Sequence, residues 1–254
     1  GGLSVAYQPM FAPDGSRIEC CEALARWTHG ERGPVSPIVF IPLAEEIGLV
    51  GDITRFMLRQ ACLDCMSWPA HISVSVNLSV LDLHNSEIVG LVADTLAETG
   101  LPPSRLHLEV TESCLMEETA KVRTILQELR ARGITIAIDD FGTGYSSLSY
   151  LDALPLDIIK IDRSFVRNIR EDARRFKLLR GTVNLARELD LKTVIEGVET
   201  SDQLALINEA LERTQGVVAH AAQLLGLRRT TLVEKLRKYG IDRYHHVSTD
   251  EVYG

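Results

Sequence analysis

Long apolar runs are absent from this chain: among its 254 residues, no eighteen consecutive residues are apolar. We therefore expect no membrane-spanning helix. The N-terminus lacks a basic stretch followed by an apolar block, so we also expect no signal peptide. No G-x-G-x-x-G motif opens the chain, which leaves a dinucleotide-binding fold without support. A hydrophobic content of 45% still allows a full core, in one large α/β domain or in one domain with an appendage.

Cysteine is scarce, and its pattern excludes a disulfide framework. The five cysteines form an odd set without a second pair at metal-binding spacing, which fits a reducing compartment and a cytoplasmic location. Cys62 and Cys65 do form a C-x-x-C motif, but they lie in a predicted helix over residues 54–66. Because residues i and i+3 share one helix face, core packing is favoured over a redox or metal-binding role.

Positive charge is sparse over most of the chain, whose net charge is −8, but it is concentrated near the C-terminus. Residues 213–238 contain six basic side chains and one acidic side chain, a net +5, so the remainder carries −13. This balance argues against a chain that binds nucleic acid throughout. An acidic body with a basic tail indicates two functions.

Polar residues follow directly after five short apolar runs, at 72–76, 106–108, 134–138, 158–159 and 193–195. Runs of this length, rich in Ile and Val, are typical of buried parallel strands when helices separate them. Because alternating β/α folds place their chemistry where parallel strands end, these polar residues are expected to share one rim. They are Asn77, Glu109, Asp139 with Asp140, Lys160 and Glu196.

Helical periodicity separates the runs, at 86–98, 117–130 and 171–189. Repeated β-then-α units predict an α/β fold with a parallel sheet and outer helices, and their number favours a closed TIM-like (β/α) barrel over an open sheet. Two further strand candidates, 4–7 and 17–24, are separated by a short turn at 13–15. A turn that short joins antiparallel strands, so the barrel is expected to have one antiparallel strand at an irregular edge.

The predicted rim, together with Glu22, offers oxygen ligands without a neighbouring cysteine or paired histidine. Such a set selects Mg2+ or Mn2+ over zinc, and crowded carboxylates need a cation to offset their repulsion. With Lys160 beside them, the set suits metal-dependent hydrolysis of a phosphodiester. For any single carboxylate, a solvated strand end or a helix N-cap is the plainer interpretation. The loop at 140–147, with Gly142 and Gly144, allows backbone N–H groups to approach a ligand.

Several ordered motifs resemble those of the EAL family of bacterial signalling phosphodiesterases, which cut cyclic di-GMP to linear pGpG. The resemblance covers about residues 3–204. It is carried by Glu22-Ala23-Leu24-Ala25-Arg26, Asn77-Leu78-Ser79, Glu109-Val110-Thr111-Glu112, Asp139-Asp140-Phe141-Gly142-Thr143-Gly144, Lys160-Ile161-Asp162 and Glu196-Gly197-Val198-Glu199.

This resemblance implies a role for each matching residue. Glu22, Asn77, Glu109 and Asp139 would bind one of two Mg2+ or Mn2+ ions, with Asp139 or Asp140 reaching the second. Lys160 would hold the attacking water or the phosphate, Glu196 would act as a ligand or general base, and Glu112 would brace the 140–147 loop. The substrate would contact Gln8, Leu24, Arg26, Gly142 and Glu199. A homodimer near the Asp140 loop is implied by the same resemblance.

The resemblance to the EAL family weakens after residue 204, where the usual last strand is replaced by two predicted helices joined at Gly226. Residues 206–241 resemble the Fis-type helix-turn-helix of bacterial regulators, which would direct Arg228, Arg229, Thr230, Thr231 and Lys235 toward DNA. The alternative is a helical cap with a solvated basic face. Residues 242–254 resemble a stretch of nucleotide-sugar dehydratases, and we interpret them as a tail without its own activity.

The sequence therefore predicts three regions: an EAL-like barrel at 1–204, a helix-turn-helix-like segment at 205–241 that replaces the last strand, and a tail at 242–254. The leading hypothesis is metal-dependent hydrolysis of cyclic di-GMP. One alternative is a catalytically weak or inactive sensor of cyclic di-GMP that is coupled to a DNA-binding segment. A further alternative is a C-terminal end that does not fold cleanly. A barrel lacking its last strand would leave an unpaired edge beside the site.

Overall fold

The structure is a computed structural model that describes residues 2–12, 16–112, 120–142, 151, 154–167, 169, 172–198, 203 and 207. Its strands are β1 (Gly2–Phe11), β2 (Ile18–His29), β3 (Gly33–Val35), β4 (Ser73–Leu78), β5 (Leu106–Thr111), β6 (Thr135–Phe141), β7 (Ile158–Ile161) and β8 (Lys192–Ile195). Its α-helices are α1 (Pro37–Glu46), α2 (Val50–Met66), α3 (Val80–His84), α4 (Glu87–Thr99), α6 (Ala120–Ala131) and α8 (Ala173–Glu188). Two 3-10 helices, η1 (Pro103–Arg105) and η2 (Arg163–Phe165), precede β5 and follow β7.

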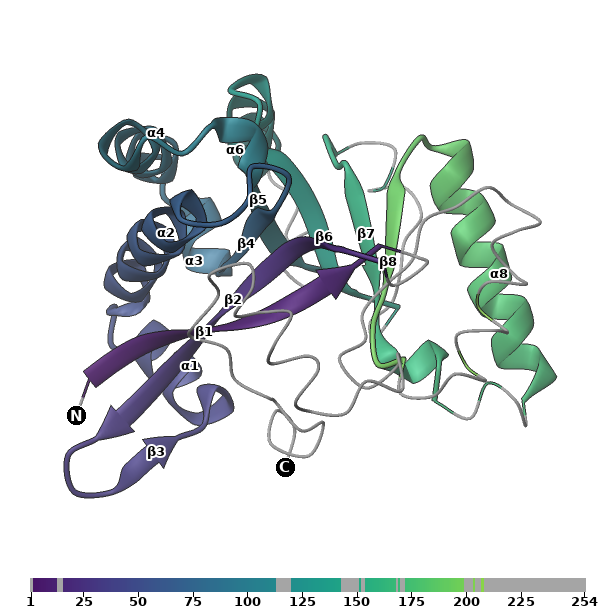
Figure 1. Ribbon diagram of the computed structural model, residues 1–254, viewed down its shortest axis with the longest axis horizontal. Coiled ribbons are helices and arrows are strands. Elements are labelled where there is room, and N and C mark those ends of the chain that lie inside the picture. Colours follow the sequence, from purple (N-terminus) through teal and green to yellow (C-terminus); the bar gives the residue numbers. More distant parts are fainter. Residues whose placement is uncertain are drawn as a thin grey trace.

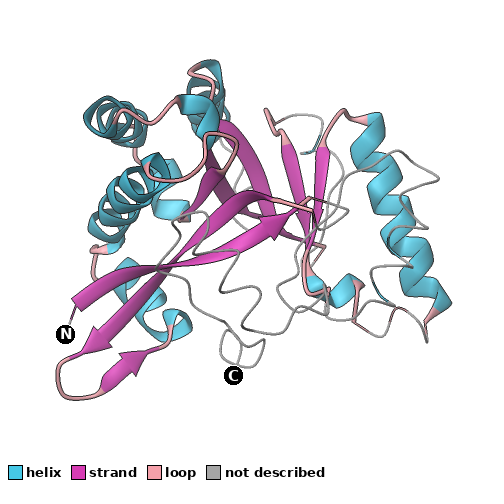
Figure 2. Ribbon diagram, viewed as in Figure 1, coloured by secondary structure: helices cyan, strands magenta, loops and turns pink. Residues whose placement is uncertain are grey.

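All of the strands belong to one curled sheet, with helices on its outer face (Figures 1 and 2). The order is β1-β2-β4-β5-β6-β7-β8, and β3 pairs with β2 off this path. β1 and β3 run antiparallel to β2, whereas every pair from β2–β4 to β7–β8 is parallel. The prediction of a TIM-like α/β barrel with an antiparallel edge is confirmed. Among the described strands, the path ends at β1 and at β8 without pairing between them.

Side chains alternate in direction along the strands. One set points outward into the core beneath the helices, and the other points into the interior of the curled sheet. Val74, Val76, Leu108 and Val110 point outward and are almost completely buried. They pack under the outer helices, where burial of each such side chain contributes about 1.5–3 kcal/mol. The residues between them on β4 and β5 face inward, so the same alternation that builds the core directs Glu109 into the interior.

Arg105 fixes the end of the sheet at which the parallel strands begin. Its guanidinium donates to the carbonyl oxygens of Ile72, at 2.8 Å, and of Cys65, also at 2.8 Å. These carbonyls lie before β4 and at the C-terminal end of α2, where helix carbonyls lack partners and the helix dipole favours a cation. One side chain therefore joins the end of α2 to the starts of β4 and β5.

Two helices were not predicted, for different reasons. In α1, the sequence Pro-Ile-Val-Phe-Ile-Pro-Leu-Ala is apolar on every side, with exposed Ile38, Val39 and Leu43, and therefore shows no amphipathic period. In α3, only five residues are helical, and a capping box holds them: Ser79 accepts a hydrogen bond from the Asp82 backbone N–H, and Asp82 accepts one from that of Ser79.

The predicted helices at 54–66, 86–98, 117–130 and 171–189 correspond to α2, α4, α6 and α8, with shifts of a few residues at their ends. The predicted turn at 13–15, the DNA-binding residues and the tail at 242–254 lie outside the described residues. Among the described helices, none combines the length and the apolar character needed to cross a bilayer.

Candidate active site

The ammonium group of Lys160 lies at the centre of a ring of carboxylates. Lys160 comes from the middle of β7 and is 1% exposed. Its Nζ lies 2.6 Å from Glu109 Oε2, 3.0 Å from Asp139 Oδ1, 3.0 Å from Glu196 Oε1 and 3.4 Å from Glu22 Oε2. Side chains that are up to 174 positions apart in the sequence thus meet at one point. Glu109, Asp139, Lys160 and Glu196 follow the apolar runs whose polar residues were expected to share a rim, and Glu22 joins them from within β2.

The charges of this ring do not balance. Burial alone would lower the pKa of Lys160, but the surrounding carboxylates, Asp139 foremost, outweigh burial and raise the pKa well above its ordinary value. Lys160 therefore stays protonated and supplies one positive charge against four carboxylates. Burial raises the pKa of Glu109 and raises that of Glu196 to about 8, while Lys160 opposes both shifts. A further cation would stabilise the ionised form of the ring.

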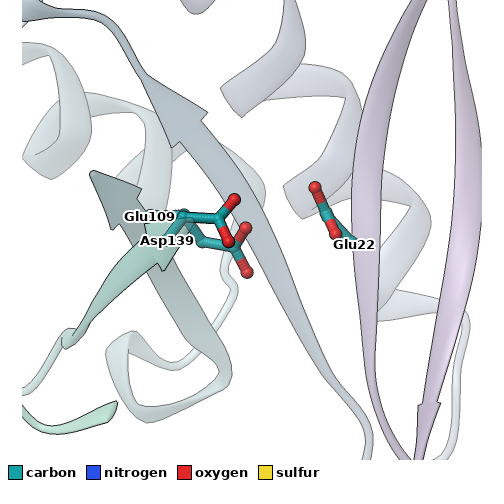
Figure 3. Close-up of side chains that lie close together, drawn as sticks. All are labelled: Glu22, Glu109 and Asp139. Carbon is teal, nitrogen blue, oxygen red and sulfur yellow. The ribbon is translucent and has the colours of Figure 1, made fainter. Parts of the chain in front are cut away.

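Two groups of carboxylate oxygens have the spacing of a metal site. Glu22, Glu109 and Asp139 offer oxygens that all lie within 4.8 Å of one another, and so do Asp139, Asp140 and Glu196. Figure 3 shows the first group, with Glu22 reaching from β2 toward Glu109 on β5 and Asp139 on β6. Asp139 belongs to both groups. All of these ligands are carboxylates, which fit Mg2+ or Mn2+ rather than a soft metal.

Asn77, the remaining predicted ligand, lies next to the first group but is exposed. Its Nδ2 donates to Glu22 Oε1 at 3.0 Å. The amide group thus orients a carboxylate of the ring, and its oxygen would face a cation only after rotation of the amide.

A short network holds the backbone after β6. Glu112 is buried, and its Oε2 accepts a hydrogen bond from the Gly142 backbone N–H at 2.8 Å. Gly142 has φ +97, and a Cβ there would lie 2.2 Å from Cε2 of Phe165, so only glycine fits. Asp140 has φ +54, which is unusual for a residue with a side chain, and its N–H donates to Asp139 Oδ1 at 2.9 Å. This backbone conformation places both aspartates at the second group.

Some of the residues predicted to contact substrate lie on the same inward face of the sheet as the carboxylate ring. Leu24 and Arg26 alternate with Glu22 along β2, so their side chains share its inward face, and Gln8 is paired with Glu22 across β1 and β2. Glu199 lies outside the described residues, as do Arg228, Arg229, Thr230, Thr231 and Lys235.

Some residues at the site were not singled out from the sequence. Phe165 packs against Gly142. A Cβ added to Gly197 would lie 2.2 Å from the Cβ of Arg163, so the Arg163 side chain occupies the space that a larger residue would need. Asp162 caps η2 by accepting a hydrogen bond from the Ser164 N–H. The motif Lys160-Ile161-Asp162 pointed to this turn, but the contacts depend on tertiary packing that no local pattern reveals.

The C-x-x-C motif lies in the core. Cys62 and Cys65 are fully buried on α2 and are not joined in a disulfide. Burial raises the pKa of Cys62 to about 12 and that of Cys65 to about 11, which keeps both thiols protonated and unreactive. The interpretation as packing residues is confirmed for this pair.

Two family models match the chain. The model of the EAL domain matches residues 1–213, and that of the bacterial regulatory proteins of the Fis family matches residues 203–239. The two matches overlap over residues 203–213. The prediction of an EAL-like body followed by a Fis-like segment is therefore confirmed.

Similar proteins of known name come from Pseudomonas aeruginosa. The cyclic di-GMP phosphodiesterase NbdA is 38% identical over 245 residues, which cover 94% of this chain and 31% of NbdA. The bifunctional diguanylate cyclase/cyclic di-GMP phosphodiesterase MucR is 43% identical over 206 residues, or 79% of this chain and 30% of MucR. The chain thus spans about a third of the length of these curated relatives.

Solved structures show the same fold. The phosphodiesterase of MucR in complex with cyclic di-GMP superposes with a TM-score of 0.78 at 39% identity, over 85% of this chain and 88% of that one. The EAL domain of Mycobacterium smegmatis DcpA superposes with a TM-score of 0.73 at 30% identity, over 96% of this chain and 100% of that one.

Proposed function

The chain belongs to the EAL domain family, and from this premise we propose that it hydrolyses cyclic di-GMP to linear pGpG with Mg2+ or Mn2+. The observation that carries the proposal is the pair of carboxylate groups that share Asp139 around Lys160. Relatives that are named as cyclic di-GMP phosphodiesterases, NbdA and MucR, support the choice of substrate.

The donor set fits two divalent ions, with Glu22, Glu109 and Asp139 holding one and Asp139, Asp140 and Glu196 the other. When bound, such ions lower the pKa of a water molecule and neutralise charge on the phosphate oxygens. Asn77 supports the first group through Glu22.

The protein's own groups would position the reactants. The Lys160 ammonium, buried and protonated, is a fixed hydrogen-bond donor for an attacking water or a phosphate oxygen. Glu196, at the end of β8, has a carboxylate near Lys160 that would accept the proton of that water. Glu112 would hold Gly142 and so fix the loop against the substrate, while Gln8, Leu24, Arg26 and Glu199 would contact the substrate away from the scissile bond.

Product analysis with purified protein tests this function. Incubation with cyclic di-GMP and Mn2+ or Mg2+ should yield pGpG, and a chelator should stop the reaction. The Asp139→Asn variant, which retains the size of the side chain, serves as the inactive control. Ligand binding without any pGpG from the unaltered chain would overturn the enzymatic proposal.

The match to the Fis family favours a second activity, namely DNA binding by residues 205–241 through Arg228, Arg229, Thr230, Thr231 and Lys235. A catalytically weak or inactive sensor that passes the presence of cyclic di-GMP to this segment is the alternative to an enzyme. Calorimetry separates the two, because a sensor would bind cyclic di-GMP in the presence of metal ions without consuming it.

The boundary between the two regions is part of the proposal, with a barrel over 1–204, the Fis-type segment over 205–241 and a tail over 242–254. Limited proteolysis should release a stable body by cleavage near residue 209. A homodimer near the Asp140 loop is a separate prediction, for which light scattering of the purified chain is the test.

A further inference from the structure

Helix α8 carries an unusual excess of positive charge for this protein. Its sixteen residues include Arg174, Arg175, Lys177, Arg180 and Arg187 against a single acid, Glu188. The chain as a whole has a net charge of −8. A helix with a net charge of +4 therefore stands out from an acidic body, and its positive charge needs an explanation.

Three of the basic side chains, those of Arg174, Lys177 and Arg180, lie away from the buried face of α8. Leu179, Val183 and Ala186 are buried, which fixes the face that packs on β8. Arg174 and Lys177 are exposed and Arg180 is half-buried. Leu178, between them, is 53% exposed. In Figure 1, α8 stands beside β8, apart from α2, α4 and α6.

Three of these cations have no anionic partner among the described residues. No ion pair there involves Arg174, Lys177 or Arg180, whereas Arg175 pairs with Asp172 at 3.4 Å. The unpaired group, Arg174, Lys177 and Arg180, is called the α8 basic face below. Its members recur at every third residue and extend over about 9 Å of helix axis, at 1.5 Å per residue.

The position of the basic face at the start of α8 does not favour the helix itself. The N-terminal end of a helix carries a partial positive charge, and its first turn prefers acidic residues. The first turn of α8 contains no acid, and a cation there costs about 0.3–1 kcal/mol. The N-cap carboxylate of Asp172 pairs with Arg175, not with Arg174. Helix stability therefore does not account for Arg174, but an anionic partner outside the helix would.

The topology brings this face near the start of the Fis-type segment. α8 follows β7 and so begins at the rim where the parallel strands end, and β8 returns the chain to that rim at Ile195. The match to the Fis family begins at residue 203, eight residues later. Eight residues span at most about 28 Å. The Fis-type segment is therefore tethered to the same rim from which α8 begins, and a duplex held by that segment is the anionic partner that the family matches offer for the basic face.

We propose that the α8 basic face is a second DNA contact, which binds backbone phosphates beside the stretch of duplex held by the Fis-type segment. This inference rests on the proposed DNA-binding function of residues 205–241. The face presents three long cationic side chains within about 9 Å, so each can reach a separate phosphate of the densely charged backbone. Such contacts add affinity without adding sequence preference.

The test measures binding of the full chain to a fluorescent mixed-sequence duplex over a series of NaCl concentrations. Each lost phosphate contact reduces the slope of log K against log[NaCl] by about 0.9. The triple variant Arg174→Gln, Lys177→Gln, Arg180→Gln should therefore bind with a slope that is shallower by about two to three. Glutamine retains helix propensity, and circular dichroism checks that the variant is folded.

A matched control removes the same charge elsewhere. Arg55, Arg123 and Arg132 are exposed on or next to α2 and α6, and no ion pair among the described residues involves them. Their triple replacement by Gln should leave the slope unchanged. An unaltered slope in the α8 variant, or an equal loss in this control, would overturn the inference.

A variant in the Fis-type segment, Arg228→Gln with Arg229→Gln, separates failure of the inference from failure of its premise. If this variant abolishes binding and the α8 variant leaves the slope intact, only the inference about α8 is wrong. If the unaltered chain does not bind the duplex even at low salt, the proposed DNA-binding function fails and the α8 contact fails with it.

Discussion

Lys160 and Glu109 form an ion pair of 2.6 Å in which the two side chains are only 1% and 2% exposed. A pair this deeply buried gains its strength from the low dielectric around it, and removal of one partner leaves an uncompensated charge. Glu109 belongs to the first group of candidate metal ligands, and Lys160 also contacts Asp139 and Glu196 of the second group. It therefore links the stability of the barrel to the metal that the site is proposed to hold.

Replacement of Lys160 by Met should destabilise the protein more in the absence of metal than in its presence. The four carboxylates would lose the cation that contacts all of them, at a cost of about 3–5 kcal/mol, and a divalent ion would restore part of that stability. Thermal unfolding with a chelator and with Mn2+ measures both values. The control variant Arg59→Met breaks an exposed ion pair with Glu98, and its free energy of unfolding should change by less than about 1 kcal/mol. Equal stability of Lys160→Met and the unaltered chain without metal would contradict this account.

Loss of Asp139 should remove both metal ions, because Asp139 belongs to both ligand groups. Glu22→Gln affects only the first group and Glu196→Gln only the second. Titration with Mn2+, followed by electron paramagnetic resonance of the free ion, should give no tight site in Asp139→Asn and one in each of the other variants. Turnover should fall by at least about 100-fold in all three, since each loses transition-state charge stabilisation. Two tight sites in Asp139→Asn would refute a shared ligand.

Gly142→Ala should impair activity without unfolding the barrel. The new Cβ would meet Phe165 at 2.2 Å and would occupy a φ of +97, which costs about 1–3 kcal/mol. Adding Phe165→Ala removes the clash but not the backbone strain, so the double variant should recover only part of the turnover. Gly181→Ala is the control, because it lies within α8 with no atom near its Cβ position and should stabilise the protein by about 0.5–1 kcal/mol. Full recovery in the double variant would show that the backbone strain is negligible.

The buried thiols of Cys62 and Cys65 predict a loss of stability in alkaline solution. In the unfolded chain, these thiols ionise near their ordinary pKa of 9, whereas burial raises the pKa of Cys65 to about 11 and of Cys62 to about 12. The unfolded state thus releases protons that the folded state retains, so this contribution is complete below pH 9 and is lost as the pH rises toward 11 and 12. Urea unfolding should give a lower free energy of unfolding at pH 10 than at pH 8. In the double variant Cys62→Ala, Cys65→Ala, the difference between the two pH values should be smaller.

Alkylation provides an independent check on the same thiols. Iodoacetamide at pH 8 should leave Cys62 and Cys65 unmodified in the folded chain and modify both in urea, as followed by peptide mass mapping. Rapid modification of either residue in the folded chain would contradict the packing interpretation and reopen a redox role for the motif.

The strands and their polar ends could be predicted because both are local signals. The run of Ile134 to Ile138 followed by two aspartates indicates a buried strand and a polar rim without any knowledge of its neighbours. The central position of Lys160 could not be predicted, because it depends on the register of β7 against β6 and β8. The Glu112–Gly142 hydrogen bond, across thirty residues, agrees with the loop-bracing role that the EAL resemblance implied for Glu112, although no local pattern indicates it. The helix α1 escaped prediction because its apolar residues surround it on every side.

Arg105 has a consequence for how proteins with this fold can diverge. It secures the end of the sheet opposite to the carboxylates, using backbone carbonyls that every sequence supplies. Substitutions among the carboxylates leave that anchorage untouched. Variants that lose catalysis through these carboxylates can therefore keep the opposite end of the sheet assembled, which separates the part of the fold that anchors α2 from the part that carries the chemistry.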